Sequence, residues 1–174
     1  MLTSPLAVTI RPLAPHDSID GLTALLHRSY AMLGAMGLNY TAVDQTPEVT
    51  RSRIAGGRCL MAVDAADRVI GTVLFYPPGR TSGSPWLSRP EVAKCAQFAV
   101  DPPFQKQGIG VRLTAAVEAE ARAAHAKEIA LDTAEPATHL IEWYCRRGYR
   151  FIEHVQWRSK RYRSVILSKS LELA

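Results

Sequence analysis

Residues 100–113 read VDPPFQKQGIGVRL, and this stretch decides the fold. The residues that lead into it, Val92–Val100, form a β-rich run that predicts a strand. Beyond it, apolar residues recur at helical spacing on Leu113, Ala116, Val117, Ala121 and Ala124. The stretch therefore leads from a strand into a helix, predicted over 111–126, through a turn that contains Gly108 and Gly110.

This turn has the properties of an anion-binding site. The first turn of a helix leaves amide protons without intrahelical partners, and the helix dipole adds partial positive charge there. Two glycines without Cβ atoms let a phosphate approach those amides. Leu113 stands where a dinucleotide fingerprint has its third glycine, and Val111-Arg112 replaces the Lys-Ser/Thr of a P-loop. Taken alone, the pattern leaves a plain tight turn into a helix as the alternative.

The remaining pattern predicts one α/β (α+β) domain over residues 1–174. Apolar residues spaced three or four apart predict a first helix over 19–33, with Asp17 as its N-cap. The other predicted elements are strands over 8–10, 59–63, 69–76, 128–132, 150–157 and 162–167, a helix over 137–147, broken helix and loop over 34–57, and a long loop over 77–90. A strand–helix–strand unit requires a right-handed crossover between parallel strands. We therefore expect a mixed, mostly antiparallel sheet of about seven strands with helices on both faces.

The composition is that of an ordinary globular protein with a mild positive excess. The 174 residues include 21 Lys+Arg and 16 Asp+Glu, a formal net charge of +5, and 47% of them are hydrophobic. The excess is local, because residues 146–174 contain eight basic and two acidic side chains. Apolar residues interrupt this segment as they do in amphipathic strands. We interpret it as a solvated face of the last strands and predict no nucleic-acid partner.

Several features of the sequence argue against a membrane span, a signal peptide, disulfide bonds and a metal site. The longest uncharged stretch, 29–43, has 15 residues and is too short to span a bilayer. The first residues lack the basic region of a signal peptide. Three scattered cysteines without a CxxC motif indicate reduced thiols, and the histidines show no metal-ligand spacing. We predict a cytoplasmic protein with no metal and no membrane contact, in which Cys95 and Cys145 are small buried residues and not nucleophiles.

Two motifs together resemble the GNAT family of N-acetyltransferases. The first lies within residues 93–113 and comprises a strand, Val-Asp-Pro and Gln-x-x-Gly-x-Gly opening a helix. The second, roughly 35 residues on, is the run from Leu140 to Tyr149, which resembles the family's Tyr-x-x-x-Gly-Phe/Tyr ending of the penultimate helix. Ile10-Arg11-Pro12 is also similar to the family's first strand. The resemblance therefore spans most of the chain.

The resemblance implies acetyl-CoA as the cosubstrate, held mainly by backbone groups. Its pyrophosphate would lie on the turn amides, and its pantetheine arm would run along the preceding strand, which splays away from the strand at 129–132. The cofactor-binding residues implied in this way are Phe98, Ala99, Val100, Gln105, Lys106, Gln107, Gly108, Ile109, Gly110 and Val111. The Lys106 ammonium group would add a charge contact to a phosphate or remain a solvated surface group.

The resemblance also assigns proton chemistry to the site. Tyr144 of the second motif is implied as the general acid that protonates the departing thiolate, and the alternative is a core aromatic. Lys94 stands where some family members have a glutamate, and a protonated lysine cannot act as the base. Glu91 is the nearest acid to that position. A water chain that includes Gln97 is the other candidate for the base.

Two classes of function follow from the resemblance. The first is an acetyl-CoA-dependent N-acetyltransferase that acts on the primary amine of a small molecule or a peptide. The acceptor would lie over residues 30–57 and 77–90, with Tyr30, Tyr40 and Trp86 as apolar walls. The second is a non-catalytic acyl-CoA-binding regulatory module. The retained Tyr144 favours the first, and such a domain is compatible with a homodimer.

Overall fold

The structure, a computed structural model, describes residues 7–172. The strands are β1 (Thr9–Pro12), β2 (Arg58–Val63), β3 (Val69–Tyr76), β4 (Val92–Val100), β5 (Glu128–Ala134), β6 (Arg150–Val155) and β7 (Ser164–Ser170). The helices are α1 (Ile19–Ala35), α2 (Thr41–Asp44), α3 (Pro47–Ala55), α4 (Ile109–Ala123) and α5 (Thr138–Cys145), with a 3₁₀ turn at Pro102–Phe104.

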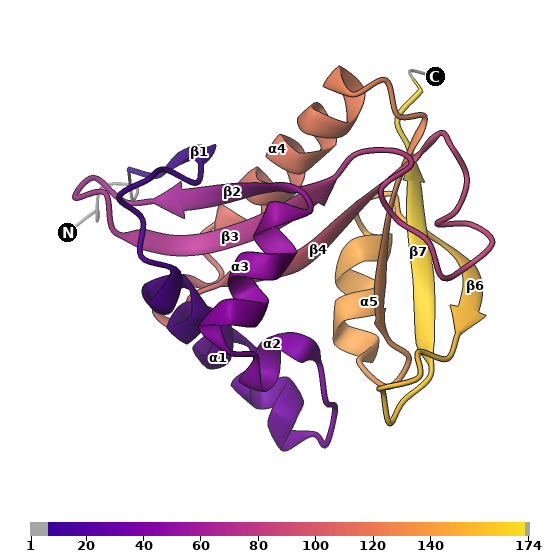
Figure 1. The fold of residues 1–174 in the computed structure, drawn as a ribbon, viewed down its shortest axis with the longest axis horizontal. Coiled ribbons are helices and arrows are strands. Elements are labelled where there is room, and N and C mark those ends of the chain that lie inside the picture. The colour runs from indigo at the N-terminus through magenta and orange to yellow at the C-terminus, as the bar shows by residue number, and fades with distance from the viewer. Residues whose placement is uncertain (1–6, 173–174) are drawn as a thin grey trace.

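The strands form one sheet in the order β1-β2-β3-β4-β5-β7-β6 (Figure 1). Only the β4–β5 pair is parallel, as the crossover through α4 requires. The predicted fold class, a mixed and mostly antiparallel sheet with helices on both faces, is confirmed. Among residues 7–172, no helix is both long and apolar enough to cross a membrane.

Alternate side chains of β2 pack on opposite faces of the sheet, so the core has a part on each face. Cys59, Met61 and Val63 pack with the α1 residues Leu22, Leu25 and Leu26. The residues between them, Leu60 and Ala62, pack on the opposite face with Leu113 and Val117 of α4. Successive side chains of a strand point to opposite faces, so a strand buried on both sides reads as a continuous apolar run.

The loop 77–90 contributes to the core of the second half of the sheet. Its Leu87 is fully buried and packs with Val92, Ala130 and Ile166. Gly83 in this loop adopts a φ of +97°, and a Cβ there would meet the Trp157 ring. The loop is therefore a packed cover over β5 and β7, as Figure 1 shows for the segment between β3 and β4.

The strands β4 and β5 separate soon after they begin. Their ladder pairs only Val92 with Glu128, Ala93 with Ile129 and Lys94 with Ala130. Beyond it, β5 continues to pair with β7, and β4 remains paired with β3. A bulge in β4 places Gln97 in the left-handed region at φ +52°. The bulge bends β4 where the two halves of the sheet diverge.

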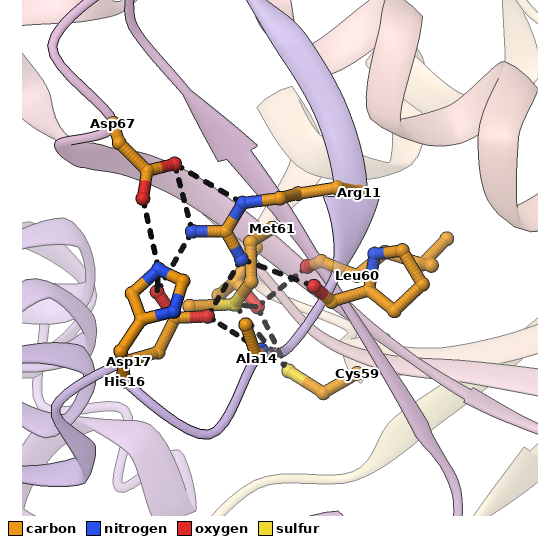
Figure 2. Close-up of polar contacts among 10 residues, drawn as sticks. Arg11, Ala14, His16, Asp17, Cys59, Leu60, Met61 and Asp67 are labelled. Carbon is orange, nitrogen blue, oxygen red and sulfur yellow. Dashed lines mark hydrogen bonds and ion pairs between the residues drawn. The ribbon is translucent and has the colours of Figure 1, made fainter.

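The cap predicted for α1 is wrong. The cap is Ser18, whose hydroxyl accepts a hydrogen bond from the Gly21 amide. The Asp17 carboxylate instead accepts hydrogen bonds from both terminal nitrogens of Arg11 and from the Ala14 amide (Figure 2). Arg11 lies on β1, so a nearby guanidinium draws Asp17 away from the helix terminus.

The segment 34–57 is more helical than its broken pattern predicts. α3 has Thr46 as its N-cap and Pro47 at its first position, a combination suited to a helix start. The prediction that Cys145 is buried is also wrong, since Cys145 is exposed on α5, whereas Cys95 is buried.

Candidate active site

A cavity of about 970 Å³ lies where β4 and β5 separate. Residues from α1, α2, α3, β4, β5 and α5 line it, together with the turn before α4 and the β6–β7 loop. It holds the turn residues Gly108 and Gly110 as well as the cationic side chains Lys94 and Lys160. One cavity therefore joins the predicted anion-binding turn to a polar chamber.

The turn before α4 offers free amides to an anion. Gly108 is the N-cap of α4 at φ +82°, a conformation that glycine adopts without strain, and no side chain caps this helix. The amides of the first helical turn, Ile109–Val111, have no intrahelical acceptor. A Cβ on Gly110 would approach Phe98 and Trp143 to 3.2 and 3.4 Å. The two glycines thus serve different purposes, one for backbone geometry and one for close packing.

An ion pair anchors α1 to the end of β4 beside this turn. Arg28 donates from Nε to Asp101 Oδ1 at 3.0 Å and from Nη2 to Asp101 Oδ2 at 2.7 Å. Asp101 is the aspartate of the Val-Asp-Pro motif, and its amide donates to the Ile70 carbonyl. The motif aspartate therefore fixes the segment that enters the turn. Nothing in the sequence identified Arg28 as its partner.

The cavity edge of β4 carries side-chain hydrogen bonds at two carbonyls. The Tyr30 hydroxyl donates to the Phe98 carbonyl at 3.0 Å. Ser29 Oγ and Gln105 Nε2 both donate to the Val100 carbonyl, at 3.1 and 3.0 Å. Because β5 has already separated here, these carbonyls have no partner strand on that side. The edge is therefore available to a ligand that pairs as a strand does, either beside these donors or in their place.

Tyr144 lies on α5 and lines the cavity. Its side chain is 8% exposed and packs edge-on against Trp143 and Tyr149. Burial raises the pKa of the Tyr144 hydroxyl well above its usual value. The hydroxyl therefore keeps its proton at neutral pH and is available as a hydrogen-bond or proton donor.

Lys94, Asp132 and Trp157 form a polar group where the strands begin to separate. Lys94 Nζ lies 2.7 Å from Asp132 Oδ1, and Trp157 Nε1 donates to Asp132 Oδ2 at 3.0 Å. Lys94 also lies 5.7 Å from the centre of the Trp157 ring. Sequence reasoning noticed Lys94 but not its carboxylate partner, which lies 38 positions later on β5.

A buried polar network lies on the α1–α3 side of β4. Gln45 Nε2 donates to Gln97 Oε1 at 3.1 Å and to Thr50 Oγ1 at 2.7 Å, and Arg53 Nη1 donates to Gln45 Oε1 at 2.8 Å. Gln97 Nε2 is buried without a hydrogen-bond partner in the described chain. The bulge in β4 thus presents an unused donor beside the cavity.

Most residues implied as cofactor-binding line this cavity. Phe98, Ala99, Val100, Gln105, Lys106, Gly108, Gly110 and Val111 do so. Gln107 and Ile109 do not contribute to the lining, and the Ile109 side chain lies in the core. Tyr30 and Tyr40 are cavity walls, whereas Trp86 packs over β5 and β7 instead.

Of the two remaining candidate residues, Cys95 lines the cavity and Glu91 does not. Glu91 is not part of the cavity lining, and its carboxylate pairs with Arg89 at 2.6 Å. Cys95 lines the cavity, but burial raises the pKa of its thiol to about 12, so it stays protonated. Within the described part of the chain, no cluster of three or more His, Cys, Asp or Glu side chains could hold a metal ion.

Comparison with known proteins agrees with this geometry. The sequence model of the acetyltransferase (GNAT) family matches residues 30–149. An S-(2-succino)cysteine N-acetyltransferase of Bacillus subtilis (strain 168) is 28% identical over 139 residues, which is 79% of this chain and 81% of the relative.

Solved structures share the fold at low sequence identity. A GNAT family acetyltransferase from Elizabethkingia anophelis, solved with acetyl-CoA bound, superposes with a TM-score of 0.66 at 19% identity, covering 94% of this chain and 97% of the other. The ribosomal-protein-S18-alanine N-acetyltransferase from Escherichia coli gives a TM-score of 0.71 at 14% identity, with 96% of each chain covered.

Proposed function

The chain belongs to the acetyltransferase (GNAT) family, and from this membership we propose that it transfers an acetyl group from acetyl-CoA to a primary amine. The observation that carries the proposal is one cavity that joins the uncapped start of α4 to the buried Tyr144 hydroxyl. The relative that acts on S-(2-succino)cysteine and the structural neighbour that acts on a ribosomal alanine support an amine acceptor.

Acetyl-CoA fits the residues at the turn and along β4. It supplies a thioester-bound acetyl group, and its phosphates match the free amides of Ile109–Val111. Gly108 supplies the left-handed conformation of the turn, and the space beside it is open, since a Cβ built there would meet nothing within 4 Å. The unpaired edge of β4 at Phe98–Val100 would align the arm of the cosubstrate with the cavity axis.

Tyr144 is the proposed general acid. Its hydroxyl holds a proton at Oη throughout the neutral range because burial raises its pKa. A departing alkyl thiolate has a conjugate-acid pKa of about 8.5 and leaves more readily when a nearby donor stabilises it. Tyr144 would stabilise the developing negative charge on sulfur by donating this proton or a strong hydrogen bond.

Water held near Gln97 is the proposed route for the proton of the acceptor amine. An alkylammonium group has a pKa of about 10.4 and must lose a proton before it attacks. Gln97 Nε2, buried without a described partner, can hold such a water by donating to its oxygen. Glu91 is less suited to this role, because it is paired with Arg89 and does not line the cavity.

Turnover with a panel of primary amines tests the proposal. Detection of the acetylated amine by mass spectrometry avoids thiol reagents, which would also react with the exposed Cys145. Product formation that depends on both acetyl-CoA and amine supports the enzyme. Saturable acetyl-CoA binding with no product from any amine would favour the alternative, a non-catalytic acyl-CoA-binding regulatory module.

A further inference from the structure

Four cationic side chains of residues 7–172 line the cavity without a carboxylate partner, and two of them, Arg53 and Lys160, lie outside both the turn before α4 and the end of α5. Arg53 of α3 uses Nη1 to donate to Gln45 Oε1, and Lys160 of the β6–β7 loop donates to the Asn39 carbonyl at 2.8 Å and to Thr41 Oγ1 at 2.9 Å. All three acceptors are neutral oxygens. Across residues 7–172 neither cation forms an ion pair, whereas Lys94 in the same cavity is paired with Asp132.

In the described chain, neither of the nearby acidic side chains pairs with Arg53 or Lys160. Asp132 is the acid that lines the same cavity, but its oxygens are already bonded to Lys94 and Trp157. Asp44 is near Lys160 but exposed and outside ion-pair distance. Burial and the charge of Arg53 lower the pKa of Lys160, as expected for two cations that share a partly desolvated chamber.

The two cations lie away from the phosphate-binding turn. The Arg53 carbonyl accepts a hydrogen bond from Tyr76, and Tyr76 pairs with Lys94 near the start of β4. The Arg53 head group donates to Gln45, which donates to Gln97 at the bulge, three residues before Val100 and about 10 Å of extended strand from the turn. Cations at this distance from the turn amides are poorly placed to bind the pyrophosphate of acetyl-CoA.

The chamber around the cations is otherwise aromatic and held in a fixed shape. Tyr40 and Tyr162 pack in a tilted arrangement with 5.3 Å between ring centres, and both line the cavity. Asn39 fixes the loop that carries Lys160, donating to the Ser159 carbonyl and accepting from the Arg161 amide. Gln45 fixes the Arg53 head group, because its own amide donates to Thr50 and Gln97. The free N–H groups of Arg53 and Lys160 therefore face a preorganised pocket.

We propose that Arg53 and Lys160 bind a carboxylate of the acceptor, so that the preferred substrates are amino acids and related amines that carry a carboxylate. A guanidinium presents a planar fork of donors that matches a carboxylate, and an ammonium adds a second charge-assisted hydrogen bond. The carboxylate would hold the amine toward the bulge in β4 and Tyr144. This inference rests on the proposed function, since it names the acceptor class of that same site.

Matched acceptors test the inference with the full chain and acetyl-CoA. L-methionine and L-phenylalanine are each compared with the corresponding α-carboxamide, L-aspartate and L-glutamate with the corresponding diamide, and phenethylamine serves as an amine without a carboxylate. The acetylated products are quantified by mass spectrometry. For at least one side chain, the acid should exceed its amide at least tenfold in kcat/KM, because the amide leaves two cations unpaired.

Charge-removing variants identify the residues responsible. Arg53→Gln and Lys160→Gln should raise KM for the acid at least tenfold and bring the acid-to-amide ratio toward one, with little change in the binding of acetyl-CoA. Arg51→Gln and Arg158→Gln are matched controls, because both residues are exposed and lie two positions away. Thermal unfolding of each variant confirms that it folds.

The outcomes separate the inference from the proposed function. Equal turnover of acid and amide by the unmodified protein would overturn the inference and leave the acetyltransferase intact. Weaker acetyl-CoA binding by Arg53→Gln would overturn it too, by placing that cation on the cosubstrate. Binding of acetyl-CoA without acetylation of any amine would reject the proposed function, and the inference with it.

Discussion

Lys94 Nζ lies 2.7 Å from Asp132 Oδ1 and joins β4 to β5 at the point where the two strands separate. Lys94 belongs to the final pair of the parallel ladder, opposite Ala130, so beyond it the strands share no backbone hydrogen bonds. Trp157 Nε1 binds the other oxygen of Asp132. The position at which a carboxylate base was considered is therefore occupied by a cation that is neutralised across the cleft.

Removing one partner of this pair should destabilise the fold. Lys94→Met would leave the Asp132 carboxylate with Trp157 alone, and a half-buried charge that loses its partner costs about 1–2 kcal/mol. The free energy of unfolding from urea titration measures this. Lys127→Met is the control, because its pair with Glu172 is exposed on both sides. Equal stability of the two variants would show that the Lys94 pair contributes nothing.

Tyr144→Phe should lower kcat at least tenfold with little change in the affinity for acetyl-CoA. The substitution removes the proton donor and preserves the ring that packs against Trp143 and Tyr149. Steady-state kinetics and calorimetric titration with acetyl-CoA separate the two effects. An unchanged kcat would exclude Tyr144 as the acid.

The pH dependence of kcat gives a second check on Tyr144. Its pKa is raised by burial, so the protonated form that the mechanism needs is retained as pH rises. A general acid with an ordinary pKa near 10 would already begin to deprotonate at about pH 9. We expect no loss of kcat from Tyr144 between about pH 8 and 9.5 in the unmodified protein. A fall over that range that is absent from Tyr144→Phe would show that the pKa of Tyr144 is not raised.

Gly108→Ala should weaken acetyl-CoA binding at least tenfold. Gly108 adopts φ +82°, and a side chain there costs about 1 kcal/mol, which disfavours the turn conformation that presents the free amides. Gly79→Ala is a close control, because Gly79 has φ +79°, equally open surroundings and no place in the cavity lining. Both variants should lose similar stability, and only Gly108→Ala should lose affinity. Similar affinities in calorimetry would argue against phosphate binding at the turn.

The Asp17 carboxylate should stabilise the fold in a pH-dependent manner. Hydrogen bonds from Arg11, and then from the Ala14 amide, hold the pKa of Asp17 below its usual value. For such a group, the stabilisation is fully present above the unfolded pKa, about 3.9, and is lost as pH falls through the lower folded value. The stability difference between the unmodified protein and Asp17→Asn should be constant from about pH 5 to 8 and shrink below about pH 4. A difference that does not shrink in acid would contradict this.

Local patterns in the sequence predicted the elements but not the long-range polar partners. The apolar spacing on Leu113 and Val117 and the run Val92–Val100 correctly place the central strand and helix. Asp17 was misassigned because a helix cap and an ion pair require the same residue type, and Arg11 lies on a separate strand. The partners of Lys94 and Asp101 could not be predicted, because each depends on a tertiary contact between distant elements.

In the candidate site, too, residues that are consecutive in the sequence were predictable, and residues brought together by tertiary contacts were not. The turn around Gly108 was predictable, because a strand, two glycines and a helix are consecutive in the sequence. Arg53 and Lys160 were not, since they are 107 positions apart and meet only through the loop fixed by Asn39. The irregular stretches 34–57 and 156–163 give no periodic signal that would reveal such a pocket.

The most direct test of the central claim is whether the protein forms an acetylated amine when supplied with acetyl-CoA and the amine panel. We predict saturable formation of the acetylated product with one CoA released per acetyl group transferred, and loss of most of this turnover in Tyr144→Phe. Tight binding of acetyl-CoA with no acetylated product from any amine would contradict the account and identify the protein as an acyl-CoA-binding module.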